Sequence, residues 1–156
     1  MMATPDPFDL QRFVVAQADI YQEALDEIRK GRKQTHWMWF IFPQLAGLGM
    51  SPTSQHYGIT GLREAAAYLS HSLLGPRLIE CSEGVLLVTG RSARDIFGSP
   101  DDMKLRSSAT LFARVTDASS VFHKILEQYF AGQVDPRTIA LLGDVMPRDE
   151  KGERPS

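Results

Sequence analysis

The sequence predicts an all-α fold, a single compact orthogonal bundle of about eight short helices. Apolar residues recur at helical spacing in most segments, whereas the alternation typical of a half-buried strand is almost absent. Glycines, prolines and capping residues separate these segments at short intervals, so each helix is expected to be short. The chain has 156 residues and no internal repeat, which favours one helical domain over residues 1–143. The polar, proline-bearing segment 144–156 is expected to be a disordered tail.

Start and stop signals define three helices in the first part of the chain. The segment "DPFDLQRFVVAQ" carries its apolar residues on one helical face. Asp19 is the predicted N-cap of the second helix, and Gly31 is its predicted end. Thr35 is the predicted N-cap of the third helix. This helix ends before Pro43, because the residue before a proline avoids the helical region.

A loop and two helices are predicted next. The glycines, serines and proline of "AGLGMSPTSQHYGITG" are typical of a long loop. Thr60 is the predicted N-cap of the alanine-rich segment "LREAAAYLSH", and Pro76 fits the first turn of the following helix. Near the end of that helix, "VLLVT" is compatible with a helix or with a short strand.

The last part of the chain predicts four more helices. Ser92 is expected to cap a short helix that ends at Gly98. "SPDD", residues 99–102, has the pattern of a cap, a first-turn proline and two first-turn acids. "VFHKILEQYF" is amphipathic at helical spacing, and "DPRTIALLG" predicts a final capped helix.

The composition restricts the function classes. A formal net charge of −2 argues against a dedicated nucleic-acid binder, and the single cysteine argues against a zinc cluster. The histidines lack metal-ligand spacing, so we expect no metal site and no cofactor. We find no secretory signal and no apolar run near the roughly 20 residues that span a bilayer. A cytoplasmic protein without a membrane partner is therefore expected, and its oligomeric state stays open.

The segment "THWMWFIFPQL", residues 35–45, contains both tryptophans within an unbroken apolar run. One interpretation is a central core helix that the other helices cover. The other is that an indole forms the wall of a ligand pocket, because its face stacks on planar rings and cations. The candidate binding residues in this segment are His36, Trp39 and Gln44.

Two further segments carry polar groups. Four cations precede the aromatic run, namely Arg29, Lys30, Arg32 and Lys33. They either complement the dipole of the preceding helix or contact a phosphate-bearing ligand. Another set of candidate ligand contacts is Gln55, His56 and Tyr57, beside Gly58, which allows a close backbone approach. Lys104 is a candidate anion contact near a predicted helix N-terminus, although helix capping alone also explains that segment.

Several segments of the chain, taken in order, resemble one family of uncharacterised bacterial and fungal proteins. They include "GRKQTHWMWFIFPQLAGLG", "IFGSPDDMKLRSSATLF" and "DPRTIALLG". The family is domain of unknown function 1810, and the resemblance implies a helical fold and no established activity. Its members often carry the label calpastatin. That label denotes an extended calpain inhibitor, and a core-rich chain contradicts it.

A shorter likeness concerns "TSQHY" followed by a helix and "KLRSS", which resembles the layout of the NADAR family. That resemblance implies binding of ADP-ribose derivatives and, in some members, cleavage of N-glycosidic bonds. The family motif has a glutamate where this chain has Gln55, and a glutamine cannot act as a general acid or base.

These patterns give two functional hypotheses. The first is a small-molecule site for a nucleotide or ADP-ribose-like ligand, with or without N-glycosidic hydrolysis, so whether the protein is an enzyme stays open. A hydrolytic acid would come from one of Glu64, Glu80, Asp101 and Asp102. The alternative is a non-catalytic protein-interaction module that uses an exposed apolar or basic patch.

Overall fold

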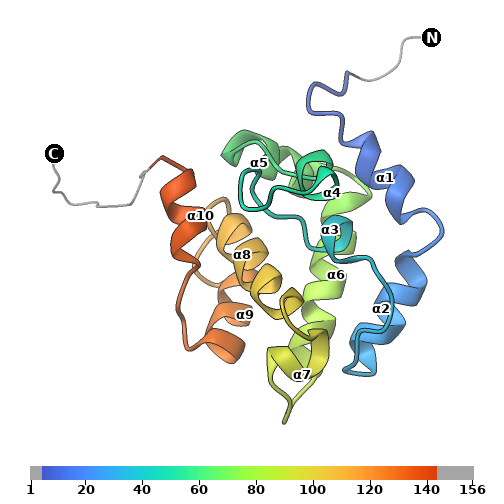
Figure 1. Ribbon diagram of the computed structural model, residues 1–156, viewed down its shortest axis with the longest axis vertical. Helices are drawn as coiled ribbons and strands as arrows, with labels where there is room; N and C mark the ends of the chain where they lie inside the picture. Colours follow the sequence, from blue (N-terminus) through green and yellow to red (C-terminus); the bar gives the residue numbers. More distant parts are fainter. Residues whose placement is uncertain (1–4, 144–156) are drawn as a thin grey trace, which may run out of the picture.

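The computed structural model describes residues 5–143, so the predicted tail 144–156 lies outside the described residues. The all-α class is confirmed, with ten helices in the described part of the chain rather than about eight (Figure 1). In chain order the helices are α1 (Gln11–Gln17), α2 (Tyr21–Arg29), α3 (Met38–Ile41), α4 (Pro52–His56), α5 (Leu62–Ser70), α6 (Leu74–Leu87), α7 (Ala93–Phe97), α8 (Asp101–Ala113), α9 (Val121–Phe130) and α10 (Pro136–Leu141).

The long loop predicted after the aromatic run contains a helix that the sequence patterns did not predict, α4. Ser51 Oγ accepts a hydrogen bond from the amide of Ser54, and Pro52 occupies the first turn. These are ordinary start signals for a helix. In the sequence, the glycines on either side of this segment led to the prediction of a loop. The strand alternative for "VLLVT" is also wrong, because α6 continues to Leu87.

Two predicted N-caps are confirmed. Ser92 Oγ accepts a hydrogen bond from the amide of Asp95, whose carboxylate accepts one from the amide of Ser92. Asp135 Oδ2 accepts one from the amide of Thr138 and so caps α10. Three predicted helix ends are also found, at Gly31, before Pro43 and at Gly98.

Four predicted N-caps are wrong, namely Asp19, Thr35, Thr60 and Ser99, because α2, α3, α5 and α8 begin without a side-chain cap. Two of these side chains bind carboxylates instead. The hydroxyl of Thr35 donates to Glu27, and the hydroxyl of Thr60 donates to Glu64. Each helix begins later than predicted, with Trp37 and Gly61 in the N-cap positions, so neither threonine oxygen is placed to accept from a first-turn amide.

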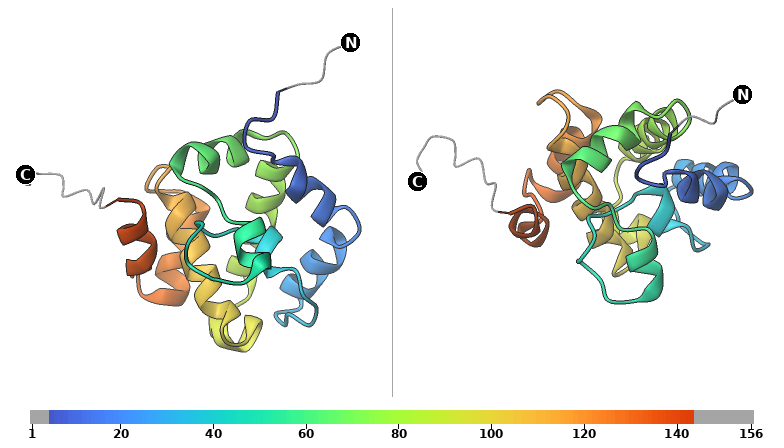
Figure 2. Two further views of the ribbon diagram at one scale, coloured as in Figure 1. Left: turned by 45° about the horizontal axis from the view of Figure 1, so that its top comes forward. Right: turned by 90° about the horizontal axis from the view of Figure 1, so that it is seen from above.

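The longest helix, α6, lies near the centre of the bundle. Figure 1 shows α1 and α2 on one side of it and α8, α9 and α10 on the other. Figure 2 shows α4 and its flanking loops on one face of the bundle. The buried apolar residues of the described part, apart from Ile139, form one continuous cluster, whose largest members are Trp37, Tyr68, Phe13, Phe42 and Phe112.

Most of the aromatic run belongs to this core. Trp37, Ile41 and Phe42 are at most 2% exposed, whereas Trp39 is half-buried. The core interpretation therefore holds for the run as a whole, and Trp39 alone of the two indoles reaches the surface. Among the helices of residues 5–143, none is both long enough and apolar enough to span a bilayer.

Candidate functional site

A buried carboxylate on α2 organises the loop that leads to the aromatic run. Glu27 is 6% exposed and accepts hydrogen bonds from the amides of Gln34 and Thr35. It also accepts from the hydroxyl of Thr35 and from the indole Nε1 of Trp37, each at 2.8 Å. Burial raises the pKa of Glu27, but these hydrogen bonds outweigh burial and hold the pKa below its ordinary value.

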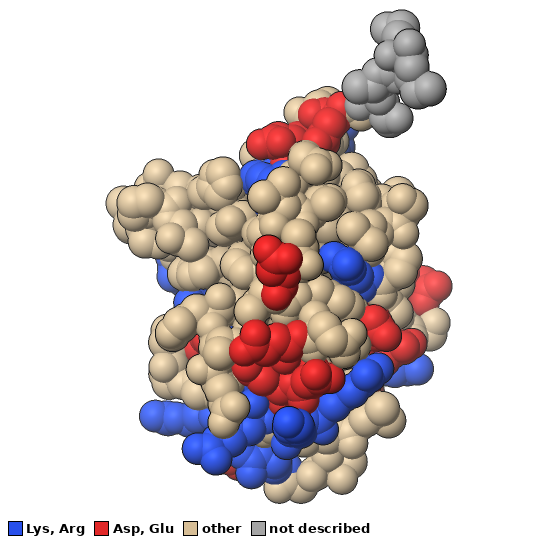
Figure 3. Space-filling view, turned by 90° about the vertical axis from the view of Figure 1, so that its right-hand side faces the viewer, with Lys and Arg blue, Asp and Glu red and all other residues tan. Residues whose placement is uncertain are grey.

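Lys33 is the one cation of the preceding basic segment that turns inward. Its side chain is 8% exposed, and Nζ donates to the carbonyl oxygen of Thr35 at 2.7 Å and to Asp101 Oδ2 at 2.9 Å. The ammonium also lies 5.1 Å from the centre of the Trp37 ring. The other three cations, Arg29, Lys30 and Arg32, are exposed. Basic side chains gather at one end of the face that carries α1 and α2 (Figure 3).

Asp101 connects this segment to Lys104 on the next turn of α8. Lys104 Nζ lies 3.1 Å from Asp101 Oδ1, so one carboxylate pairs with two ammonium groups. Lys104 Nζ also lies 3.8 Å from the centre of the Trp39 ring, in a cation–π contact. The lysine is therefore held between an acid and an indole, with 19% of its side chain exposed.

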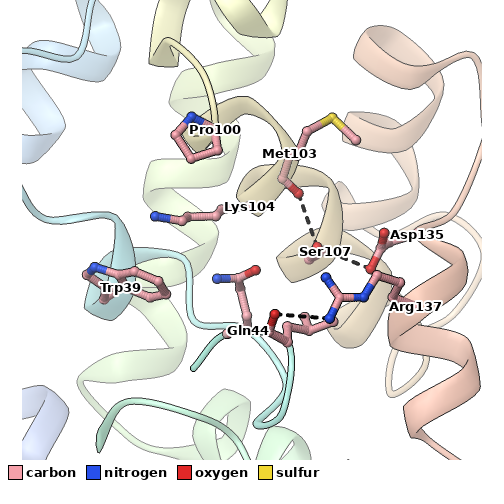
Figure 4. Close-up of a pocket in the computed structure, with 10 residues that line it drawn as sticks. Trp39, Gln44, Pro100, Met103, Lys104, Ser107, Asp135 and Arg137 are labelled. Carbon is pink, nitrogen blue, oxygen red and sulfur yellow. Dashed lines mark hydrogen bonds between the residues drawn. The ribbon is translucent and has the colours of Figure 1, made fainter. Parts of the chain in front are cut away.

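Trp39 and Lys104 line a surface pocket of about 340 Å³ between α3, the loop that follows it, α8 and α10 (Figure 4). The other lining residues are Gln44, Leu48, Gly49, Pro100, Met103, Ser107, Asp135 and Arg137. The side-chain amide of Gln44 has no hydrogen-bond partner among residues 5–143. It offers a free donor and a free acceptor to a ligand.

The opposite wall of the pocket comes from α10. Asp135 Oδ2 accepts hydrogen bonds from Ser107 Oγ at 3.2 Å and from Thr138 Oγ1 at 2.6 Å, besides the helix-capping bond. Arg137 is exposed, and its Nη2 donates to the carbonyl oxygen of Leu48 at 3.2 Å. The pocket therefore has a lysine with an indole on one side and an acid with an arginine on the other (Figure 4).

The fold brings together three of the seven predicted ligand residues, Trp39, Gln44 and Lys104, in this pocket. A fourth, Tyr57, lines an adjoining recess of about 10 Å³ with Trp39 and Gln44, which has room for about one water molecule.

The remaining three predicted residues lie elsewhere: they do not line the pocket, and all are exposed. They are His36, Gln55 and His56. The amide of Gln55 donates to the carbonyl oxygen of Met50, and the ring of His56 packs edge-on against Tyr57.

Gly58 allows a close backbone approach, but the neighbour is Ala46 rather than a ligand. A Cβ atom at Gly58 would lie 2.7 Å from that of Ala46. Here the chain forms an isolated parallel bridge in which Ile59 donates to the carbonyl oxygen of Gln44 at 2.9 Å. This bridge fixes the backbone that carries Gln44 and the loop beside the pocket.

The four acids considered for hydrolysis do not line the pocket. Glu64 is 1% exposed and bound by Arg12 and Thr60. Glu80 accepts a hydrogen bond from Tyr21 on the other side of the molecule. Asp101 lies between the two lysines, and Asp102 Oδ1 is buried without a hydrogen-bond partner among the described residues. Among the pocket residues the acid is Asp135.

Sequence reasoning missed Asp135, Ser107 and Arg137. Asp135 was predicted as a helix cap, a role that it fills, and nothing near it in sequence indicates a ligand. The available sequence signal is the run of small polar residues "SSAT", residues 107–110, in a segment predicted to be helical. The structure shows that Ser107 and Thr110 are buried, and a buried polar group needs a polar neighbour. That neighbour is Asp135, whose amide donates to Thr110 Oγ1 at 2.9 Å.

The fold and the pocket define a class of all-α protein with a polar, aromatic-walled surface pocket. No three His, Cys, Asp or Glu residues of the described part lie close enough together to hold a metal ion. The chain matches the family model described as "Protein of unknown function (DUF1810)" over residues 7–142, and it belongs to that family.

One similar solved structure is the conserved hypothetical protein Rv1873 from Mycobacterium tuberculosis. It is 60% identical to this chain, with a TM-score of 0.86, and the match covers 88% of this chain and 98% of that one. The comparison with curated proteins gives no match.

Proposed function

We propose that the pocket between α3, α8 and α10 binds a small anionic ligand that carries a planar ring, such as a nucleotide or part of an ADP-ribose-like molecule. The observation that carries this proposal is the position of Lys104, 3.8 Å above the Trp39 ring at a pocket that also contains an unpaired amide. An aromatic wall, a cation and a free amide are what recognition of a ring with an anionic substituent requires.

Each side chain has a separate role in this proposal. The half-buried Trp39 offers its ring edge and remaining surface to a planar group. The amide of Gln44 pairs with a ring edge that carries both a donor and an acceptor. Lys104 contacts the anionic group, and the exposed Arg137 stands at the opposite wall as a second cation.

The size of the pocket favours a ligand no larger than a mononucleotide. A volume of about 340 Å³ is at the lower end of the range of about 300–1,000 Å³ for small-molecule sites. For an ADP-ribose-like ligand, we propose that one half occupies the pocket and the other lies outside it.

Hydrolysis of an N-glycosidic bond at this pocket would depend on Asp135. Three hydrogen bonds reach Oδ2, and Oδ1 accepts none among the described residues, so Oδ1 is free to activate a water molecule or to stabilise a cationic sugar. Asp135→Asn tests this role, because asparagine also caps helices. Base release measured by chromatography should stop in this variant while ligand binding persists.

Binding is tested by a thermal-shift and calorimetry panel of nucleosides, nucleotides and ADP-ribose on the full chain. A ligand at 100 times its Kd should stabilise the fold by about 2.7 kcal/mol. Trp39→Ala should weaken binding at least tenfold, whereas Val15→Ala, at an exposed position on α1, should leave it unchanged. No shift with any compound at millimolar concentration would refute the proposal.

The alternative, a protein-interaction module, has less support. The exposed large apolar side chains are scattered over α1, α6, α8, α10 and the loops, and every Phe, Tyr and Trp side chain of residues 5–143 is at least partly buried. A dominant docking surface would instead gather such residues into one patch. The cytoplasmic location also stays a prediction.

A further inference from the structure

We propose that Lys33 is a positioning residue that gives the pocket its affinity for a phosphate monoester, although it does not touch the ligand itself. This inference rests on the proposed function. It specifies the anionic group of the ligand and the residue that supplies the charge to bind it. Lys33 does not line the pocket and belongs to a segment whose other cations are exposed.

The charges around Asp101 carry the inference. Asp101 pairs with Lys104 through Oδ1 at 3.1 Å and with Lys33 through Oδ2 at 2.9 Å. With Lys104 alone, the pair would be neutral and would attract an anion weakly. The second lysine leaves the cluster of two cations and one anion with a net charge of +1.

The positive charge is presented to the pocket by Lys104 and not by Lys33. The Lys33 ammonium pairs with Asp101, donates a hydrogen bond to the Thr35 carbonyl oxygen and makes a cation–π contact with the Trp37 ring. Lys104 has two such contacts, Asp101 and the Trp39 ring, and it lines the pocket. An ammonium has three N–H donors, so Lys104 keeps one for a phosphate oxygen.

The geometry of the cluster is fixed in advance. Glu27 holds the amide and hydroxyl of Thr35, and the Thr35 carbonyl oxygen holds Lys33. Lys33 in turn orients the Asp101 carboxylate toward Lys104. Preorganised donors lose less entropy when a ligand binds, which favours tight recognition of a small group. The other first-turn acid of α8, Asp102, makes no ion pair with either lysine in the described residues.

The class of ligand group follows from this charge and from the size of the pocket. One free N–H on a site of net charge +1 suits a single phosphate or other compact anion. The neighbouring indole and amide suit the ring that carries it. We infer a nucleoside monophosphate or a similar ring-bearing phosphate monoester, rather than an uncharged nucleoside.

The test compares the four common nucleoside monophosphates with their nucleosides by calorimetry at one ionic strength. The wild-type chain should bind at least one monophosphate about tenfold or more tighter than its nucleoside, the size expected for a charge-assisted hydrogen bond. Lys33→Met removes one positive charge and should therefore reduce the ratio of monophosphate affinity to nucleoside affinity about fivefold. Lys33→Arg should restore it, and the matched control Arg32→Met should leave it unchanged.

The outcomes separate the inference from the function on which it rests. Equal binding of nucleoside and monophosphate by the wild-type chain would overturn the inference, and it would reduce the proposed function to recognition of the planar ring alone. An equal loss of affinity for nucleoside and monophosphate in Lys33→Met would also overturn the inference, because that result indicates a merely structural role for the lysine. Failure of every compound to bind would refute the proposed function itself.

A salt titration of the wild-type chain covers the case in which Lys33→Met does not fold. Monophosphate affinity should fall as ionic strength rises, whereas nucleoside affinity should stay constant. Equal salt dependence of the two would overturn the inference.

Discussion

Replacing Glu27 by alanine should be among the most destabilising single changes in the chain. Glu27 is 6% exposed and accepts four hydrogen bonds, from two amides, one hydroxyl and one indole. Hydrogen bonds to a charged group contribute about 1.5–3 kcal/mol each, and a donor left buried without a partner costs about 1–3 kcal/mol.

The magnitude depends on which donors can find water in the variant. The amides of Gln34 and Thr35 are only part-buried and can be rehydrated, whereas Trp37 is 0% exposed and its indole N–H would stay unpaired. We therefore expect Glu27→Ala to lower the free energy of unfolding by about 3–5 kcal/mol. In a chain of this size, that loss lowers Tm by roughly 10–15 °C.

Glu27 should also contribute to the pH dependence of stability. Its pKa is lowered in the folded state, so the carboxylate stabilises the fold at pH values above the unfolded pKa of about 4.3. That contribution is lost as the pH falls through the folded-state pKa. Glu27→Gln should therefore show a flatter acid limb of stability below about pH 4.3 than the wild-type chain.

The assay is urea unfolding followed by circular dichroism at several pH values. Glu23→Ala is the matched control, since Glu23 lies on the same helix and is exposed. It should change stability by less than about 0.5 kcal/mol. Equal unfolding midpoints for Glu27→Ala and Glu23→Ala would refute the reasoning.

Three further predictions concern the rest of the fold. Arg12 donates to the carbonyl oxygens of Phe8, Asp9, His56 and Gly58 and to the buried Glu64, so Arg12→Ala should cost about 3–5 kcal/mol in urea unfolding, and Arg12→Lys should recover only part of it. A Cβ atom at Gly75 would lie 2.1 Å from the Leu69 carbonyl oxygen, whereas one at Gly61 meets nothing within 4 Å. Gly75→Ala should therefore lower Tm by several degrees and Gly61→Ala by little; similar values for both would contradict the packing. Burial raises the pKa of Cys81 to about 12, so its thiol should resist a thiol reagent at pH 8 until the chain unfolds, and rapid labelling of the folded chain would contradict this burial.

The sequence predicted the parts of the fold that depend on neighbouring residues. Ser92 and Asp135 cap helices through residues three positions away, and Pro43 ends α3 through its own ring. The aromatic run was rightly predicted to be mostly core, because helices with a polar face on either side of it supply its cover.

The predictions that were wrong or missed concern contacts between segments that are distant in the sequence. Thr35 was expected to cap a helix, but Glu27 of α2 binds its hydroxyl. Of the four neighbouring cations, Lys33 turns inward, where its ammonium pairs with Asp101, a residue of the distant helix α8. Likewise, α10 brings Asp135 to the pocket by packing on α8. Residue patterns within one segment carry no information about such pairings.

The central claim is that Trp39, and not Trp37, belongs to a ligand site. Only two indole N–H resonances are expected in a two-dimensional ¹⁵N NMR spectrum, because the chain has two tryptophans. As a nucleoside monophosphate is added, the Trp39 resonance should shift until the site is saturated. The resonance of Trp37, which is bound to Glu27 in the core, should stay in place. An unmoved Trp39 resonance at millimolar ligand, or equal shifts of both, would contradict the claim.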